Sequence, residues 1–139
     1  MAMTMHIDIV SAEVEIYSGT VTEVYAPAEM GEVGIMAHHA PLLTRMKPGE
    51  VRVVKLSGEV ESFFVNGGIL EVQPHVVTIL SDTALRAADL DEAAALESKA
   101  RAEAVMADKK TDYDYARART ELLEAVAQIE TIRKLRKRK

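Results

Sequence analysis

Cysteine and tryptophan are absent from this sequence of 139 residues, and aromatic side chains make up only 4% of it. Without cysteine the chain forms no disulfide, carries no cysteine nucleophile and offers no thiolate to a metal, which fits a reducing compartment. Its apolar runs fall far short of the roughly 20 residues that cross a bilayer. The segment from Met1 to His6 has neither the basic region nor the apolar stretch of a secretion signal. These absences predict a soluble cytoplasmic protein.

Positive charge is in the minority, because 17 lysines and arginines face 22 acidic residues and give a net charge of −5. An acidic protein repels bulk nucleic acid, so no nucleic-acid partner is expected. All seven glycines and all four prolines precede residue 80, whereas alanine crowds the region after Thr83. Glycine and proline punctuate strands and turns, and alanine is the best helix former. The chain is therefore predicted to divide into a β-rich unit, residues 1–86, and a helical unit, residues 87–139.

Short β-like runs alternate with turn signals in the first unit. Met5–Ile9 alternates apolar and polar residues, as a half-buried strand does, and further runs cover residues 21–26, 51–56, 60–65, 69–72 and 76–80. Turns are predicted at residues 47–50, 57–58, 66–68 and 73–75, and Asn66-Gly67-Gly68 is typical of a tight hairpin. Strands at this spacing without intervening helices predict an antiparallel β-sandwich or barrel.

The second unit is predicted to form two helices. Asp89 is expected to cap the first helix, with Glu92 reaching back to it, and the helix is expected to end near Met106. Thr111 or Asp112 is expected to cap the second, over residues 113–139. Apolar positions in the second helix are spaced alternately by three and four residues: Tyr115, Ala118, Leu122, Ala125, Ile129 and Ile132. This seam indicates coiled-coil-like packing in an antiparallel helical hairpin.

Alanine supplies much of the seam between these helices. It removes little apolar area from water, at roughly 25 cal/mol per Å². Two helices of this kind are marginal without a further surface to pack on. Two interpretations stay open: a hairpin docked permanently on the sandwich, or a mobile arm that exchanges docking surfaces because weak docking is easily undone.

The chain ends in a basic run, since six of the seven residues from Arg133 to Lys139 are Lys or Arg. One interpretation is a solvated helix end, where cations are favourably placed. A nucleic-acid patch is disfavoured because no aromatic residues are interleaved. Docking onto an acidic protein segment fits better, with ion pairs that salt would weaken.

Motifs of catalysis and metal binding are not found in the sequence. His38 and His39 are adjacent, so their side chains diverge, and no spaced third ligand accompanies them; no metal site is predicted. There is no phosphate-binding loop, no nucleophile elbow and no HExxH sequence. The chain is therefore not expected to be an enzyme by itself.

Three stretches carry a resemblance to a known family: GEVGIMAHHAPLLTRMKPG at residues 31–49, VNGGILEVQP at 65–74 and LSDTA at 80–84. They closely resemble the epsilon subunits of bacterial F-type ATP synthases, and the likeness covers essentially the whole chain. It implies a β-sandwich of about ten strands followed by an antiparallel helical hairpin. It also implies a non-catalytic subunit of the rotor, or central stalk, which couples proton flow to ATP synthesis. The sandwich would hold the gamma subunit and rest on the ring of c subunits, at the cytoplasmic face of the bacterial inner membrane.

The resemblance also implies which residues meet these partners. Glu32 and His39 match the loop that touches the c-ring, although Ala37 stands where relatives often have proline. The hairpin would either lie against the sandwich or extend along gamma into the alpha/beta hexamer and inhibit ATP hydrolysis. Its basic residues would then meet an acidic segment of the beta subunit, and the candidates are Arg133, Lys134, Arg136 and Lys137.

Some members of that family bind ATP through the pattern Leu/Ile-Asp-x-x-Arg-Ala and arginines on the second helix. Here residues 90–95 read LDEAAA, so Asp91 is retained but Ala94 replaces the arginine, and Val126 and Glu130 occupy the second-helix positions. Losing guanidinium partners weakens nucleotide binding severely, so no cofactor is predicted. Two alternative functions remain, an ATP-sensing module, which would need the missing arginines, and a helical adaptor, which would leave the sandwich without a role.

Overall fold

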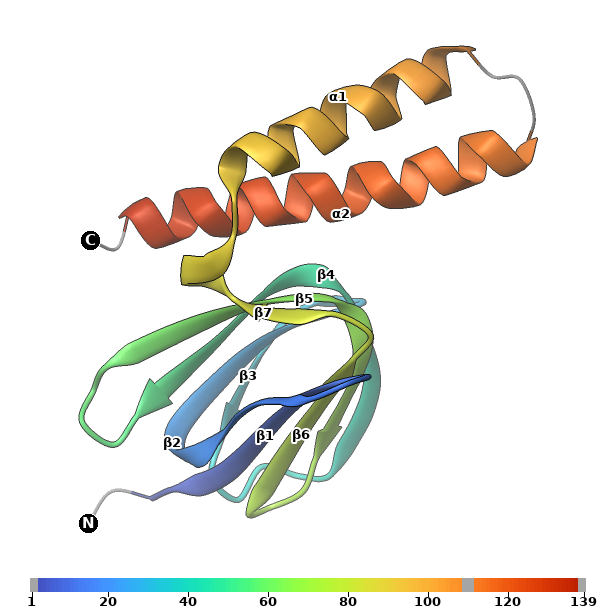
Figure 1. Ribbon diagram of the computed structural model, residues 1–139. Coiled ribbons are helices and arrows are strands. Elements are labelled where there is room, and N and C mark those ends of the chain that lie inside the picture. Colours follow the sequence, from blue (N-terminus) through green and yellow to red (C-terminus); the bar gives the residue numbers. More distant parts are fainter. Residues whose placement is uncertain (1–2, 109–111, 138–139) are drawn as a thin grey trace.

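The computed structural model describes residues 3–108 and 112–137, and it shows a sheet domain with a helical hairpin resting on it (Figure 1). The sheet domain contains seven strands within the described residues: β1 (Met5–Ser11), β2 (Glu15–Ala28), β3 (Gly31–Met36), β4 (Leu42–Lys55), β5 (Val60–Val72), β6 (Val76–Ser81) and β7 (Ala84–Arg86). A short 3₁₀ turn, η1 (Ala87–Asp89), leads into the hairpin, which consists of α1 (Glu92–Asp108) and α2 (Asp112–Lys137).

The strands form a sheet that closes on itself. Their order is β1-β6-β5-β4-β2-β3, β1 also pairs with β2, and β7 pairs with β5. All pairs are antiparallel except β1 and β6, which run parallel. The predicted class, a β-sandwich followed by a helical hairpin, is confirmed. The strand count is lower than the expected ten because β2, β4 and β5 each continue for 13 or 14 residues through bends that a count of short runs would treat as breaks.

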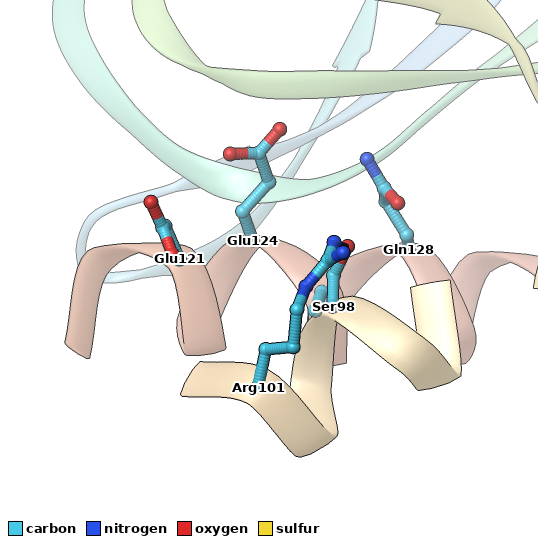
Figure 2. Close-up of a pocket in the computed structure, with 6 residues that line it drawn as sticks. Ser98, Arg101, Glu121, Glu124 and Gln128 are labelled. Atoms are coloured by element: carbon cyan, nitrogen blue, oxygen red, sulfur yellow. Dashed lines mark hydrogen bonds between the residues drawn. The ribbon is translucent and has the colours of Figure 1, made fainter. Parts of the chain in front are cut away.

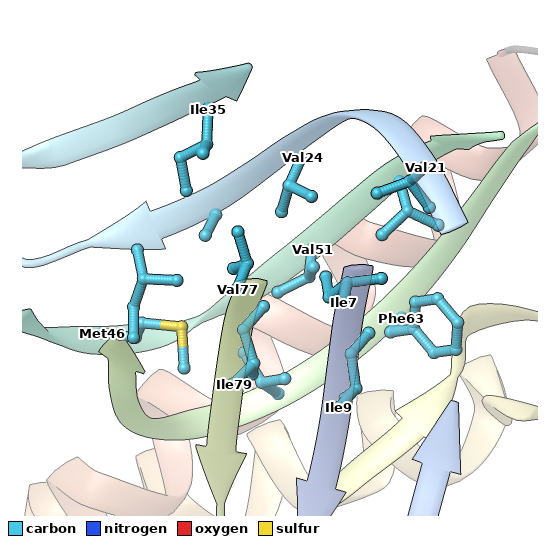
Figure 3. Packing of buried hydrophobic residues seen from close by; sticks show 14 of the residues in the cluster. Ile7, Ile9, Val21, Val24, Ile35, Met46, Val51, Phe63, Val77 and Ile79 are labelled. Carbon is cyan, nitrogen blue, oxygen red and sulfur yellow. The ribbon is translucent and has the colours of Figure 1, made fainter. Parts of the chain in front are cut away.

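Apolar side chains from all the long strands meet inside the closed sheet (Figure 3). Ile7, Ile9 and Phe63 are 0% exposed, as are Val51 and Ile79. β1 places its apolar residues on one face because successive side chains of a strand point to opposite sides. The alternation predicted for Met5–Ile9 thus produces one wall of this core.

Two predicted turns are wrong, because both segments continue as strand. Residues 47–50 lie inside β4, and Pro48 falls where the pairing of β4 with β2 is interrupted, between Arg52 and Met46. A proline lacks the N–H that a ladder needs, so it is tolerated there. Residues 66–68 lie inside β5, where Gly67 and Gly68 have φ of 77° and 113° and bend the strand instead of reversing it. A Cβ at Gly68 would lie 2.1 Å from the backbone oxygen of Leu80, so the close approach of β6 requires glycine here.

The turns predicted at residues 57–58 and 73–75 are confirmed as the β4–β5 and β5–β6 connections. The cap predicted for the first helix is wrong, because Asp89 belongs to η1 and Asp91 caps α1 instead. The Asp91 Oδ1 atom accepts hydrogen bonds from the N–H groups of Ala93 at 3.0 Å and Ala94 at 3.2 Å. This satisfies two N–H groups that have no partner within the helix. For the second helix, the predicted caps Thr111 and the Asp112 side chain lie outside the described residues.

α2 lies between α1 and the sandwich (Figure 1). It packs on β4 and β5 on one side and on α1 on the other, whereas α1 packs chiefly on α2. The predicted seam is buried or half-buried except for Tyr115, which is 37% exposed. Ala127 and Thr131 are also buried although they lie off the seam. The helix therefore has a second buried face, which a single seam did not predict.

Candidate functional site

The basic end of α2 lies beside the beginning of α1. Lys134, Arg136 and Lys137 occupy the last turn of α2, where cations face the partial negative charge of a helix C-terminus. The Nη2 atom of Arg136 donates a hydrogen bond to Oε2 of Glu92, the first residue of α1. Glu92 was expected to fold back onto a capping residue, and it instead joins the two ends of the hairpin. Arg133 is exposed on the same turn, and Arg138 and Lys139 lie outside the described residues.

A groove separates the end of α2 from the sandwich. Lys134 and Lys137 line it from the helix, and Glu32, Glu50 and Arg52 line it from β3 and β4. The Arg52 guanidinium donates through Nη2 to Oε1 of Glu32 at 2.9 Å, and its Nε lies 3.7 Å from Oε1 of Glu50. Glu50 is only 7% exposed. The groove thus brings one predicted ring contact, Glu32, close to two predicted inhibitory cations.

The side chain of Arg52 is fixed from a second direction by the ring of Tyr25. The guanidinium carbon lies 4.5 Å from the ring centroid, within the range of a cation–π contact. The Tyr25 hydroxyl donates to Oε1 of Glu23 at 2.9 Å, and this bond to a carboxylate raises the pKa of Tyr25 above its usual value. The ring of Tyr25 thus supports Arg52 on the side from which it reaches Glu32.

Glu32 and His39 are not brought together. Glu32 lies near the start of β3, whereas His39 follows its end, in the connection to β4. The His39 N–H donates to the carbonyl of Met36 at 3.2 Å, which closes a turn in which His38 has a φ of 67°. The His38 ring lies edge-on to His75 with centroids 4.9 Å apart, so the loop is tied to the β5–β6 turn.

Neither metal nor membrane chemistry is evident in the described part of the chain. No group of three or more metal-binding side chains gathers among the residues that the structure describes. Helices long and apolar enough to cross a membrane are likewise not found among them.

A strip of apolar side chains on the outer face of the sheet was missed from the sequence. Leu43 on β4, Ile69 on β5 and Leu80 on β6 are 69%, 46% and 49% exposed. Ile69 pairs directly with Leu80, and Leu43 pairs with Glu71, two residues farther along β5 on the same face. Exposed apolar side chains that gather on one face of a sheet make that face a candidate interaction site. In the sequence the strip corresponds to one apolar residue at an outward position of each of three strands. These residues can be recognised as neighbours only when the register of the strands is known.

A polar pocket lies between the two helices (Figure 2). Ser98 and Arg101 line it from α1, and Glu121, Glu124 and Gln128 from α2. Arg101 donates to the Ser98 hydroxyl at 3.2 Å, and the Glu124 side chain points toward the strands (Figure 2). Partial burial and the nearby Glu121 carboxylate raise the pKa of Glu124, although a hydrogen bond with Asn66 opposes them. Two carboxylates beside one guanidinium make this pocket unfavourable for a polyphosphate.

Comparison with known proteins identifies the family. Residues 4–87 match the family described as ATP synthase, Delta/Epsilon chain, beta-sandwich domain, and residues 88–133 match the corresponding long alpha-helix domain. The sequence is 63% identical over 138 residues to the ATP synthase epsilon chain of Nitrosococcus oceani, covering 99% of each chain. The chain belongs to the ATP synthase epsilon chain family. A further epsilon chain, from Thioalkalivibrio sulfidiphilus, is 60% identical over 138 residues, which are 99% of this chain and 98% of that one.

Solved structures similar to this epsilon-family chain share its fold. A chain of the Euglena gracilis mitochondrial ATP synthase, solved as OSCP/F1/c-ring, matches with a TM-score of 0.82 at 17% identity, covering 89% of this chain and 78% of that one. A chain from the Tetrahymena thermophila mitochondrial ATP synthase central stalk and c-ring matches with a TM-score of 0.63 at 14% identity, covering 92% and 96%. At these identities the likeness establishes the fold alone.

Members of the epsilon chain family are stalk subunits of ATP synthase and not its catalytic subunits, and this chain is one of them. The nucleotide pattern that some members carry is reduced here to Asp91, whose carboxylate already caps α1. Ala94 on α1 and Val126 on α2 offer no charge to a phosphate. The absence of ATP binding stays a prediction, and so does a domain boundary between residues 86 and 87.

Proposed function

We propose that this chain is a subunit of the rotor of a proton-translocating F-type ATP synthase, where it couples proton flow through the c-ring to ATP synthesis and restrains ATP hydrolysis. Family membership supports the first role. The restraint of ATP hydrolysis is supported by the placement of α2. This helix rests on the sandwich through small side chains, while α1 covers its other side. In this proposal the chain is a peripheral subunit at the cytoplasmic face of a bacterial inner membrane, bound there only through the complex.

The apolar strip (Leu43, Ile69 and Leu80) is the proposed face for the gamma subunit. A stalk built of helices presents apolar ridges, and such ridges bury against an apolar sheet face. The strip lies on β4, β5 and β6, and its three side chains stay exposed while the hairpin is docked. Gamma could therefore hold the sandwich while the hairpin is docked.

The proposed contacts with the c-ring are Glu32 and His39. The two residues lie toward opposite ends of β3, so a single small contact does not include both while the strand is intact. His39 lies in the loop that His38 ties to the β5–β6 turn, whereas Glu32 is held by Arg52 beside α2. A basic group of the ring would have to compete with Arg52 for the Glu32 carboxylate.

The proposed inhibitory contacts are Arg133, Lys134, Arg136 and Lys137, which would meet an acidic segment of the beta subunit when the hairpin extends. α2 has 26 residues, which at about 1.5 Å per residue span roughly 40 Å. That length reaches deep into a partner. Solvent-exposed cations on the last turns of a helix also suit an ionic contact that forms and breaks.

Removal of residues 89–139 tests this proposal. The sandwich keeps Ala87, which is 2% exposed, together with its whole core, so the truncated chain is expected to assemble with gamma and c subunits. The ATPase activity of the assembled enzyme is expected to rise, because the inhibitory arm is gone. Unchanged activity in a correctly assembled complex would contradict the inhibitory role, and failure to copurify with gamma and c would favour the helical adaptor.

A four-residue variant separates the basic end from the rest of the arm. Neutralising Arg133, Lys134, Arg136 and Lys137 to glutamine is expected to release inhibition and to flatten its dependence on salt. Neutralising Arg117 and Arg119, exposed at the other end of α2, is the control. If inhibition persists undiminished in the four-residue variant, the basic end is only a solvated terminus.

A further inference from the structure

The chain leaves the sandwich through β7, a strand of three residues that pairs with β5 alone among the described strands. So short an edge strand has few ladder hydrogen bonds to keep it in place. Its last residue, Arg86, is followed directly by η1 and then by α1. Movement of the hairpin therefore acts on β7 through Arg86.

The Arg86 side chain contacts two strands of the sandwich. Its Nη1 atom donates to Oε1 of Glu61 on β5, and its Nη2 atom donates to the carbonyl oxygen of Ile16 on β2 at 3.3 Å. The guanidinium carbon lies 5.5 Å from the ring centroid of Phe63 and 5.9 Å from that of Tyr17, within the range of cation–π contacts. One side chain thus fastens the end of β7 both to β5 and to β2.

The groups that receive Arg86 are themselves held in place. Phe63 is 0% exposed, and its ring centroid lies 5.3 Å from that of Tyr17. The Glu61 side chain is 22% exposed and also pairs with Nζ of Lys55 at 2.9 Å. Partial burial makes this carboxylate attract cations more strongly than a fully solvated one does. Hydrogen bonds between two ionised groups are in addition stronger than neutral ones.

The connection beyond Arg86 is weaker than either of its ends. Asp91 caps α1, so the helix keeps its first turn when the hairpin moves. Before it, Ala88 and Asp89 are exposed and Leu90 is half-buried. A backbone hydrogen bond of 3.2 Å, from the Leu90 N–H to the Ala87 carbonyl, holds this turn. Opening such a bond in contact with water costs little, so the turn is where the connection bends most easily.

We propose that Arg86 is a positioning residue, which anchors β7 to the sandwich so that the hairpin pivots about residues 88–90 while β7 stays in place. This inference deepens the proposed function and rests on it only for the movement of the hairpin. In the absence of the anchor, β7 would separate from β5 together with the hairpin, because so little else holds a three-residue edge strand.

The anchor keeps the tether of the hairpin short. The preceding point of attachment is Thr83, whose carbonyl accepts hydrogen bonds from the Asn66 N–H at 3.0 Å and the Ser81 hydroxyl at 2.9 Å. Loss of the anchor would therefore lengthen the free connection from residues 88–90 to residues 84–90. The effective concentration of a tethered group falls roughly as the −3/2 power of tether length, which here is about threefold. A short tether thus favours return of the hairpin to its docked position.

Amide hydrogen exchange in the full chain tests the anchor. Arg86→Gln is expected to speed exchange of residues 84–86 about three- to tenfold, with β4 as protected as before. Arg86→Lys keeps the charge without the planar fork and is expected to restore part of the protection. Lys55→Gln is the matched control, because Lys55 shares the Glu61 carboxylate and the Tyr17 ring but lies on β4. Equal exchange of residues 84–86 in Arg86→Gln and Lys55→Gln, or lost protection throughout the sandwich, would overturn the anchor.

A chain with a released hairpin shows where the pivot lies. Ala127 is 7% exposed and lines a cavity between α2 and β4, so Ala127→Lys is expected to force α2 off the sandwich. Residues 88–90 are then expected to exchange faster, while residues 84–86 keep the protection of the parent chain. Adding Arg86→Gln is expected to speed exchange in both segments, and Thr120→Lys, at an exposed position of α2, is the control. Lost protection of residues 84–86 in Ala127→Lys alone would refute the pivot.

Energy transfer measures the consequence for docking. The chain lacks cysteine, so a donor and an acceptor can be placed on Glu29→Cys, in the β2–β3 turn, and Thr120→Cys, exposed on α2. Arg86→Gln is expected to lower the ratio of docked to released chains about threefold, and an unchanged ratio would overturn the short tether. Unchanged ATP hydrolysis after removal of residues 89–139 would contradict the inhibitory role, and the exchange results would still decide the anchor.

Discussion

The sandwich and the hairpin bury their apolar residues with different side chains. In the sandwich, large and β-branched residues such as Ile7, Val51 and Phe63 are 0% exposed. In the hairpin, the buried residues are mostly alanines, including Ala102, Ala118 and Ala125, with Ile129 and Ile132 near one end of α2. Because the hydrophobic contribution scales with the area removed from water, similar exposed fractions correspond to unequal stabilisation. The sandwich is therefore expected to be stable by itself, and the hairpin is expected to depend on the surface beneath it.

This difference suits the division of labour proposed for the two regions. A part that is fixed to a rotating shaft must resist unfolding, and a part that regulates by moving must be able to leave its place at small cost. Elements that move in regulation are generally drawn from the less stable regions of a protein. A helix can therefore be largely buried and still contribute little apolar area to its docking.

The comparison is tested most strongly by truncating the sandwich core. Phe63→Ala is expected to lower the free energy of unfolding by about 3–5 kcal/mol, because it removes a fully buried ring and leaves a cavity. Denaturant unfolding followed by circular dichroism would measure the change. Ile69→Ala on the same strand, at a side chain that is 46% exposed, is the control and should cost far less. A small loss for Phe63→Ala would contradict an independent sandwich core.

A smaller and more local effect is expected for the hairpin. Ile129→Ala, at a seam side chain that is 4% exposed, should weaken the packing of α2 within the hairpin by about 2 kcal/mol, with the unfolding of the sandwich unchanged. Amide hydrogen exchange, read separately for α2 and for β4 to β6, would show the loss of protection in the helix alone. Leu123→Ala on the same helix, 54% exposed, is the matched control. Loss of protection in both regions would mean that the two parts unfold as one unit.

The smallest expected effect concerns pH. Partial burial raises the pKa of Glu124 above its usual value of 4.5, and the Glu121 carboxylate adds to this effect. Because the Glu124 side chain points toward the strands, release of the hairpin would expose it, so the docked state binds a proton more tightly than the released one. The docked hairpin is therefore favoured below that value, and this contribution is lost as pH rises through the raised pKa. Because much of this side chain meets solvent, Glu124→Gln is expected to strengthen docking at neutral pH by well under about 1 kcal/mol.

The docked fraction of the Glu124→Gln variant would be measured by fluorescence energy transfer between one label on the sandwich and one on α2. The measurement would run from pH 4.5, the usual pKa of a glutamate side chain, to neutral pH. The variant should show a flatter dependence on pH than the parent chain. Glu103→Gln, at an exposed position on α1, is the control. An unchanged slope in the Glu124 variant would assign the pH dependence to other groups.

Much of the fold could be predicted from short-range patterns. The alternation of Met5–Ile9 predicted a strand, and the three-four spacing from Ala118 to Ile132 predicted a buried helix face. Local rules failed where a partner overrode them. Gly67 and Gly68 are typical of a hairpin turn, but the approach of β6 to Gly68 makes them a bend inside β5.

The candidate site could be predicted only in part, for a related reason. The basic end of α2 is visible as a run of charges, and its residues were identified from the sequence. That Arg136 meets Glu92, and that Lys134 shares a groove with Glu32, depends on the packing of elements far apart in the chain. The apolar strip likewise consists of residues on three strands, and no local pattern joins Leu43 to Leu80.

The sequence by itself determined both helices and parts of five strands, where glycine and proline give way to alanine, and which family the residues resemble. These properties are local or compositional, so they can be read along one chain. Only the tertiary structure decided that α2 lies between α1 and β4 and that its cations face carboxylates of the same molecule. The physical reason is that charge pairing and apolar surface depend on distances in space, which closure of the sheet and docking of the hairpin establish.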